Sequence, residues 1–249
     1  MKPGPSRRDL LVGAGATLGA AVAATAARKA RAGAGQAHWG IAVDIGRCAS
    51  RDGCRACIDA CHLAHRVPSV ADPRHEIKWV WKEPFARVFP EQVTSYETEA
   101  YLRLGVLVLC NHCGKPPCTK VCPTGATWRR SDGVVAMDEH RCIGCRYCMT
   151  ACPYAARSFN WEAHKPSPGP GSYPARTLGV VEKCTLCVER IDGGLGPLCV
   201  EVCGSRGASA LTFGNLEDAG SPLRQLLASR PVLRRRPSLG TEPSVYYVG

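Results

Sequence analysis

The chain has few aromatic residues, few charged residues and no long apolar run. Aromatic residues make up 6% and charged residues 21% of its 249 residues. No stretch reaches the length of about 18 strongly apolar residues that a membrane span requires. Apolar residues still account for 45% of the chain, which excludes extended disorder. Because soluble domains usually fill their cores with aromatic side chains, this interior must be held together in another way.

What the sequence has in excess is cysteine and positive charge. It contains 16 cysteines, and its net charge is +11. The length allows one or two domains. A basic chain can bind nucleic acid, and that function has to be weighed against the pattern of the cysteines.

The N-terminal segment resembles an export signal. Arg7-Arg8 precedes a weakly apolar run over residues 10–27, and Ala30-Arg31-Ala32 fits a small-x-small cleavage pattern. This order is typical of twin-arginine (Tat) signals. We therefore expect residues 1–32 to be a Tat signal peptide, the mature chain to start at Gly33 and the protein to be periplasmic. The alternative is a basic, disordered arm.

The cysteines fall into four groups of four, and none is left over. Each group ends in Cys-x3-Cys, and groups one and three carry the longer ending Cys-x2-Cys-x3-Cys. In chain order the groups are Cys48, Cys54, Cys57 and Cys61; Cys110, Cys113, Cys118 and Cys122; Cys142, Cys145, Cys148 and Cys152; and Cys184, Cys187, Cys199 and Cys203.

Three kinds of site compete for these thiols. Disulfides suit small secreted chains, but cysteines three residues apart in a tight loop are poorly placed to bridge. Zinc sites need two cysteine pairs about a dozen residues apart, a spacing that only group four has. Group three runs Cys-x2-Cys-x2-Cys-x3-Cys-Pro from Cys142 to Pro153, which is the spacing of a bacterial ferredoxin. We therefore predict that the 16 thiols hold four 4Fe–4S clusters.

The ferredoxin pattern also predicts which thiols share a cluster. In two-cluster ferredoxins the last cysteine of each motif ligates the other cluster. Groups two and three are neighbours and are expected to pair in this way, which leaves groups one and four for each other. The predicted ligands are Cys48, Cys54, Cys57 and Cys203 for cluster 1; Cys110, Cys113, Cys118 and Cys152 for cluster 2; Cys142, Cys145, Cys148 and Cys122 for cluster 3; and Cys184, Cys187, Cys199 and Cys61 for cluster 4.

This pairing predicts an α+β fold of two bacterial-ferredoxin-like modules, one inserted in the other. The discontinuous outer module comprises residues 38–104 and 176–216, with strands over 39–45 and 210–213. The inner module comprises residues 105–163, with a hairpin at Asp132-Gly133. We expect the clusters to follow one another in the order outer, inner, inner, outer.

Two segments carry no cysteine ligands. Residues 164–175 have the composition of a flexible insertion. Residues 217–249 form a C-terminal tail with a short helix over 222–229 and a solvated basic patch at 234–236. The tail is expected either to wrap a partner subunit or to be loose.

One spacing is irregular. A regular motif would place the first cysteine of group one at Arg51, whereas Cys48 lies three residues earlier. We interpret this as a small loop insertion with Cys48 still a ligand, because no other thiol is available. The alternative is a labile or three-iron cluster with three protein ligands.

The run from Cys110 to Trp161 closely resembles the four-cluster ferredoxin subunits of the DMSO reductase iron–sulfur subunit family, which also serve polysulfide, tetrathionate and nitrite reductase systems. Asn111-His112-Cys113 and Pro116-Pro117-Cys118 carry the resemblance, together with the Cys-x2-Cys-x11-Cys-x3-Cys run of group four. The resemblance covers about residues 38–216 and the closing residues 243–248.

Within that family, residues 40–44, 57–62 and 76–82 are similar to the DsrO type, the Tat-exported periplasmic ferredoxin subunits of the DsrMKJOP complexes of sulfur metabolism. The resemblance implies a relay of single electrons through four clusters. Its partners would be an integral-membrane, quinone-interacting subunit of the NrfD or DsrP kind and a redox protein such as a multihaem cytochrome. The alternative is the ferredoxin subunit of a molybdopterin oxidoreductase, with a molybdopterin catalytic subunit as its partner.

No catalytic signature accompanies the cysteines, since the sequence has no nucleophile–base arrangement, Gly-rich nucleotide loop or metal site with an open position. We expect an electron-transfer subunit without a substrate site of its own. We do not expect nucleic-acid binding, because each cluster adds negative charge that the basic residues offset.

Some cations and histidines lie beside the ligands. A cation beside a ligand would raise the reduction potential of the neighbouring cluster, and this is expected of Lys183, Arg141 and Arg146. The alternative is that each is a solvated surface charge. Four histidines are expected to donate hydrogen bonds rather than to bind iron: His62, His65, His112 and His140.

Overall fold

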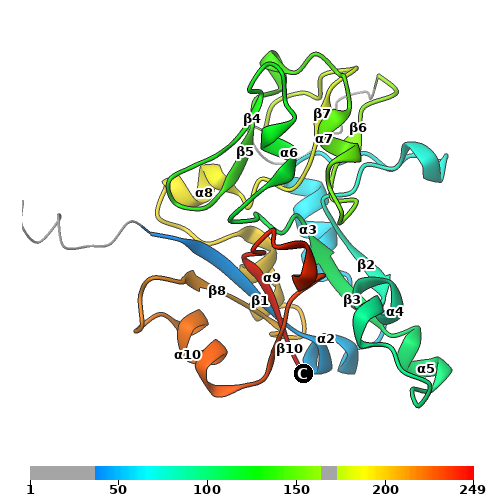
Figure 1. Ribbon diagram of the computed structural model, residues 1–249, viewed down its shortest axis with the longest axis vertical. Coiled ribbons are helices and arrows are strands. Elements are labelled where there is room, and N and C mark those ends of the chain that lie inside the picture. The colour runs from blue at the N-terminus through cyan, green and yellow to red at the C-terminus, as the bar shows by residue number, and fades with distance from the viewer. Residues whose placement is uncertain (1–36, 164–172) are drawn as a thin grey trace, which may run out of the picture. The chain divides into compact units, whose positions relative to one another are not determined.

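The largest sheet joins the start of the described chain to its end (Figure 1). The structure, a computed structural model, describes residues 37–163 and 173–249, and His38–Gly249 form one unit. The predicted signal peptide and residues 164–172 of the predicted flexible insertion lie outside the described residues. The strand order of the sheet is β8-β1-β10-β9. Its strands are β1 (Trp39–Asp44), β8 (Leu211–Asn215), β9 (Val232–Leu233) and β10 (Val245–Val248).

The strands predicted over 39–45 and 210–213 are present and pair with each other. β1 runs antiparallel to β8 and parallel to β10, and β10 runs antiparallel to β9. β10 is buried along its whole length, as a central strand with apolar residues on both faces should be.

The C-terminal tail is therefore not loose. The predicted helix is present as α10 (Pro222–Ser229), and its Leu223 is fully buried. The expected basic patch at 234–236 is only partly solvated, because Arg235 is 6% exposed and its guanidinium lies over the ring of Tyr154. The apolar sequence of β10 explains the difference, since it supplies a central strand that draws the preceding residues into the core.

Three antiparallel strand pairs complete the sheets of the described ranges: β2 (Val80–Pro84) with β3 (Gly105–Leu109), β4 (Thr127–Arg129) with β5 (Val135–Met137), and β6 (Ser158–Phe159) with β7 (Val181–Glu182). The β4–β5 pair is the predicted hairpin, and Gly133 at its turn has a φ of 88°, which favours glycine. The other two pairs join the predicted outer and inner modules, because β2 and β7 belong to one and β3 and β6 to the other.

The helices are short; seven of the 16 cysteines lie on them and the other nine lie in the loops beside them. α3 (Ala56–Ala64) and α9 (Leu198–Ser205) pack against each other beside the large sheet (Figure 1). Buried cysteines lie among aliphatic side chains in the main core. Among the described residues, no helix has the length and apolarity to cross a bilayer. The other helices are α2 (Ile45–Ser50), α4 (Phe85–Val88), α5 (Glu99–Leu102), α6 (Pro117–Lys120), α7 (Tyr147–Thr150) and α8 (Val188–Asp192), with 3-10 turns η1 (Pro73–His75), η2 (Pro90–Gln92), η3 (Glu139–Arg141) and η4 (Pro237–Leu239).

Candidate metal centres

The thiols predicted for cluster 1 lie together where α2, α3 and α9 meet. Burial raises the pKa of Cys57 to about 12, and the nearby thiols of Cys203, Cys48 and Cys54 raise it further. A regular motif would have its cysteine at position 51. Arg51 is exposed there, and its guanidinium donates to the Gly207 carbonyl at 2.6 Å. The place of Cys48 among these thiols supports the interpretation of a loop insertion.

The thiols predicted for clusters 2 and 4 line two internal cavities. Burial, with the neighbouring thiols, raises the pKa of both Cys113 and Cys184 to about 12. A thiol binds metal as the thiolate, so a bound cationic centre would compensate the cost of burying that charge. The linings include Cys110, Cys113, Cys118 and Cys152 in one cavity, and Cys61, Cys184, Cys187 and Cys199 in the other.

The thiols predicted for cluster 3 lie nearest the surface. Cys148 is buried close to Cys142, which is half-buried, and Cys145 is exposed. Burial opposes ionisation of Cys122, but hydrogen bonds from the backbone at Thr127 and at Thr124 lower its pKa below the ordinary value. This environment favours a thiolate at Cys122.

We call the four thiols predicted for each cluster a thiol set and give the set the number of its cluster. The four thiol sets follow one another in a different order from the one expected. Besides burial, the thiol of Cys57 in set 1 raises the pKa of Cys61 in set 4. In the same way, Cys110 in set 2 raises the pKa of Cys184 in set 4. Cys118 in set 2 likewise raises the pKa of Cys148 in set 3. The sets therefore run 1, 4, 2, 3, so that both outer sets precede both inner ones. The expectation of outer, inner, inner, outer was wrong. Ligand exchange within a module does not determine how the two modules dock, and here β2–β3 and β6–β7 join them.

Unpartnered polar atoms in the linings test whether these cavities suit a cluster. Asn111 is 1% exposed and lines the cavity of set 2, yet neither its amide nitrogen nor its amide oxygen has a partner among the described residues. The hydroxyl of Thr185 lines the cavity of set 4 and is likewise buried without a partner in the described part of the chain. Donors left free beside four thiols fit a group whose sulfide atoms accept hydrogen bonds.

One buried cation beside the thiols was not predicted from the sequence. Arg157 is 5% exposed, and its guanidinium donates to Cys118 Sγ at 3.0 Å and to Thr127 Oγ1 at 2.8 Å. Burial would lower the pKa of Arg157, but the thiols of Cys118, Cys148 and Cys110 raise it above its ordinary value. Because Arg157 is five residues from the nearest cysteine in the sequence, proximity along the chain gave no signal for it.

The predicted cations beside the ligands divide into two kinds. Lys183 is 2% exposed, and its ammonium donates to the carbonyls of Val135 and Cys184. Arg141 and Arg146 are exposed, as the alternative of a solvated charge implies. Arg146 lies 4.8 Å from the centroid of the Trp161 ring.

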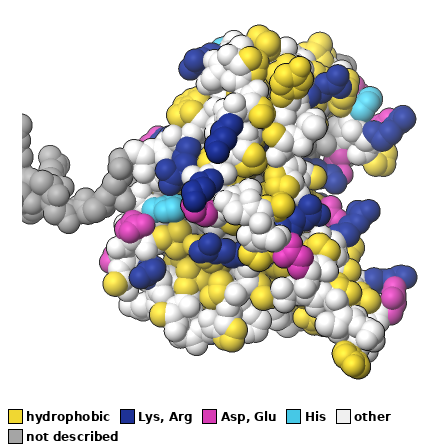
Figure 2. Space-filling model, in the orientation of Figure 1, with side chains coloured by type: hydrophobic (Ala, Val, Ile, Leu, Met, Phe, Trp, Pro, Cys, Tyr) yellow, Lys and Arg dark blue, Asp and Glu magenta, His cyan; other side chains and the backbone are white. Residues whose placement is uncertain are grey.

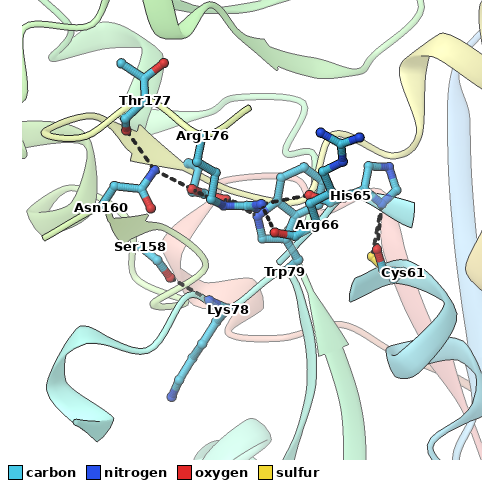
Figure 3. A network of polar contacts seen from close by, with 10 residues as sticks. Cys61, His65, Arg66, Lys78, Trp79, Ser158, Asn160, Arg176 and Thr177 are labelled. Carbon is cyan, nitrogen blue, oxygen red and sulfur yellow. Dashed lines mark hydrogen bonds and ion pairs between the residues drawn. The ribbon is translucent and has the colours of Figure 1, made fainter. Parts of the chain in front are cut away.

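Of the four predicted histidines, His65 has the closest link to a thiol set. Its Nδ1 lies 2.9 Å from the Cys61 carbonyl oxygen (Figure 3) and 3.6 Å from Cys61 Sγ. Its Nε2 lies 3.1 Å from Glu189. Burial opposes protonation, but hydrogen bonds with Cys187 and Glu189 raise the pKa of His65 to about 9. His65 therefore fits the predicted role of a hydrogen-bond donor to cluster 4.

The other three histidines differ in exposure. His112 is buried, and its Nδ1 accepts the backbone N–H of Val135 at 3.1 Å. His62 is half-buried, with its Nε2 unpartnered among the described residues, and His140 is exposed.

The comparisons with known proteins agree with this chemistry. Two family models, each described as a 4Fe–4S dicluster domain, match residues 47–126 and 106–215. The Hdr-like menaquinol oxidoreductase iron-sulfur subunit 1 of Archaeoglobus fulgidus is 39% identical, over 84% of this chain and 82% of that protein. A tetrathionate reductase subunit of Salmonella typhimurium is 33% identical, over 85% and 72%. The menaquinone reductase iron-sulfur cluster-binding subunit of Nitratidesulfovibrio vulgaris is 32% identical, over 84% and 88%.

These matches cover all four cysteine groups, and the predicted ferredoxin-like fold and four 4Fe–4S clusters are confirmed. When bound, such clusters accept and release single electrons. The chain belongs to the family of 4Fe–4S dicluster ferredoxin subunits that transfer electrons within oxidoreductase complexes of the DMSO reductase and menaquinol oxidoreductase kinds.

Proposed function

We propose that this chain is a periplasmic subunit that relays single electrons between an integral-membrane, quinone-interacting subunit and a redox partner in dissimilatory sulfur metabolism, as DsrO-type subunits do. The observation that carries the proposal is that thiols of each predicted set interact with thiols of the next, from the buried Cys48 of set 1 to set 3, which includes the exposed Cys145. The names of two relatives, a menaquinol oxidoreductase subunit and a menaquinone reductase subunit, support a quinone-linked partner.

The surface around Cys145 supports an exchange of electrons with a partner there. Ile143, in the loop before α7, is 67% exposed, Tyr147 at the start of α7 is 64% exposed, and Leu178 is 57% exposed. In Figure 2 the upper part of the visible face, over α6 and α7, carries apolar side chains beside basic ones. An apolar centre with a polar rim is typical of a surface that a partner covers.

The test is purification of the complex from detergent-solubilised membranes by a tag placed after Gly249, which is exposed. We expect an integral-membrane subunit to co-purify, and a menaquinol analogue to reduce the clusters as followed by EPR. Tyr147→Ser should weaken capture of one partner, whereas the control Leu195→Ser, also at an exposed apolar side chain, should not. Purification of the chain without any membrane subunit would contradict the proposal.

The second candidate is the ferredoxin subunit of a molybdopterin oxidoreductase, and the tetrathionate reductase relative favours it. Molybdenum in the purified complex, or a neighbouring gene for a large molybdopterin subunit, would select this candidate. Neighbouring genes for a cytochrome and a quinone-interacting subunit would select the DsrO-type complex.

Export can be tested separately. Changing Arg7 and Arg8 together to Lys should retain the protein in the cytoplasm if residues 1–32 are a Tat signal, and Lys29→Arg serves as the control. Cell fractionation gives the answer, and an unchanged location of the double variant would contradict a Tat signal.

A further inference from the structure

Two buried cations lie beside the thiol sets without an acidic partner. Among the described residues, neither Arg157 nor Lys183 forms an ion pair with a carboxylate, although they are 5% and 2% exposed. Burial of an unpaired charge is costly, so native proteins pair such groups with opposite charge. The negative charge that faces these two residues is that of the thiolates and the clusters they would hold.

Arg157 lies between sets 2 and 3. Its Nη2 atom is 3.0 Å from Cys118 Sγ of set 2, and Nη1 is 3.3 Å from the sulfur of Met137. The thiol of Cys148 in set 3 also interacts electrostatically with the Arg157 guanidinium. A guanidinium stays protonated in proteins, so this positive charge is permanent.

Lys183 lies between sets 2 and 4. It immediately precedes Cys184 of set 4, and its ammonium binds the Cys184 carbonyl at 2.9 Å. The same ammonium binds the carbonyl of Val135, a residue that lines the cavity of set 2. His112 accepts the N–H of Val135, so both backbone groups of that residue are held.

We propose that Arg157 and Lys183 are the counter-charges of cluster 2 and raise its reduction potential from its two sides. The proposal rests on the proposed ligand sets. An apolar, buried cavity disfavours the extra negative charge of a reduced cluster and lowers its potential, whereas a nearby cation favours that charge. Arg157 is shared with cluster 3 and Lys183 with cluster 4, so each cation acts on one neighbour as well. Neither cation is among the charges that act on the thiols of Cys48 and Cys57 in set 1, where Lys82 acts on Cys48 instead.

A third buried cation is not part of this arrangement. Arg235 lies 5.2 Å from the ring centroid of Tyr154, and that ring, which lines the cavity of set 2, is the group its guanidinium faces. The Nε and Nη1 atoms of Arg235 have no hydrogen-bond partner within the described ranges, whereas the guanidinium of Arg157 donates to a thiol.

The test is an EPR-monitored redox titration of the cluster-loaded protein, combined with iron analysis. Arg157→Gln should lower the midpoint potentials of clusters 2 and 3, and Lys183→Gln should lower those of clusters 2 and 4. One midpoint, that of cluster 2, should therefore fall in both variants, and one, that of cluster 1, should move in neither. Each lowered midpoint should correspond to at least a tenfold change in the ratio of oxidised to reduced cluster at a fixed potential, which is about 59 mV for one electron. The matched control is Arg141→Gln, an exposed cation next to Cys142, whose charge water screens and whose loss should shift one midpoint by less.

Charge and packing are separated by Arg157→Lys, which keeps the cation and should retain most of the wild-type midpoint. If Arg157→Gln does not retain its iron, Lys183→Gln alone still tests the proposal, because it must lower the midpoint potentials of clusters 2 and 4 and leave the other two unchanged. Variants with full iron content whose midpoints do not move would overturn the proposal, as would equal shifts of all four clusters. Either result leaves the quinone-linked function open, because that function is tested by co-purification and reduction by menaquinol.

Discussion

The indole N–H of Trp79 donates to a carboxylate oxygen of Glu182 at 2.6 Å and joins the segment before β2 to β7. The same carboxylate accepts from Arg176, whose guanidinium also donates to the carbonyls of His65 and Arg66 (Figure 3). The side chains of Arg176 and Glu182 are 5% and 2% exposed. This buried ion pair therefore holds the loop after α3 next to the strand that leads to Cys184.

Glu182→Gln should destabilise the folded protein strongly, because it removes the carboxylate that forms the ion pair with the buried Arg176 guanidinium. Removal of one partner of a buried ion pair costs about 3–5 kcal/mol. The control is Glu201→Gln, which breaks an exposed pair with Arg190 and should cost no more than about 1 kcal/mol. Anaerobic denaturant unfolding of the cluster-loaded protein gives both values, and equal values would show that the Glu182 charge is not needed.

The first thiol set gives a test of the ligand assignment. Cys203→Ser should perturb the cluster held by Cys48, Cys54 and Cys57 and leave cluster 3 intact, since Cys203 lies among those thiols. We expect about twelve rather than about sixteen irons per chain if cluster 1 is lost, and one missing EPR signal. Ser205→Ala on the same helix is the control. Loss of the cluster 3 signal instead would refute the assignment.

Cys48→Ser decides between the two interpretations of the irregular spacing. If Cys48 is a ligand, the variant should lose cluster 1 or convert it to a three-iron form, which has a distinct EPR signal. If the wild-type protein already holds a three-iron cluster there, the spectrum of the variant should match that of the wild type. Arg51→Ala, at the exposed neighbouring position, should leave the spectrum unchanged.

The sequence predicted the chemistry because ligand spacing is a local property. The run from Cys142 to Cys152 fixes three ligands within one loop, and the Asp132-Gly133 turn specifies its hairpin through the left-handed conformation of glycine. The strands around β1 and β8 were also predictable, since each is an apolar run next to a cysteine group.

What the sequence did not reveal depends on contacts between distant segments. The order of the thiol sets follows from the way β2 pairs with β3 and β6 with β7. Arg157 reaches Cys118 from 39 residues away, and β10 enters the sheet beside β1 from the far end of the chain. No local pattern encodes these contacts, because they depend on packing that only the folded chain defines.

The stability of the helix that carries Cys48 should depend on pH through Asp44. Asp44 caps α2 by accepting the N–H of Arg47 at 2.8 Å, and it also binds Arg230 at 2.5 Å. Burial opposes ionisation, but these hydrogen bonds hold the pKa of Asp44 below its ordinary value. A carboxyl whose pKa is lower in the folded state stabilises that state above its unfolded pKa of about 4, and the stabilisation is lost as pH falls through the folded pKa.

Asp44→Asn keeps the capping oxygen but removes the charge, so at pH 7 it should cost about 1 kcal/mol. The difference from wild type should stay constant from about pH 7 to pH 5 and shrink below about pH 4. Denaturant unfolding across this range measures it, with Asp52→Asn, at an exposed position, as the control. A difference that grows towards acid pH would contradict the assignment.

Two adjacent tyrosines of β10 should respond in opposite ways to loss of their hydroxyls. Tyr247 is fully buried, and its hydroxyl has no partner among the described residues, whereas the Tyr246 hydroxyl accepts from Arg234 at 3.1 Å. A buried hydroxyl without a hydrogen bond costs about 1–3 kcal/mol, while a made hydrogen bond contributes about 1 kcal/mol.

Tyr247→Phe should therefore leave stability unchanged or increase it, and Tyr246→Phe should decrease it by about 1 kcal/mol. Both variants keep the ring, so packing in the strand is matched, and denaturant unfolding of the cluster-loaded protein compares them directly. A loss of stability in Tyr247→Phe as large as that in Tyr246→Phe would mean that an ordered water binds the Tyr247 hydroxyl. In that case a buried water would lie beside β10, and the loss of its hydrogen bond to the Tyr247 hydroxyl would explain the lower stability.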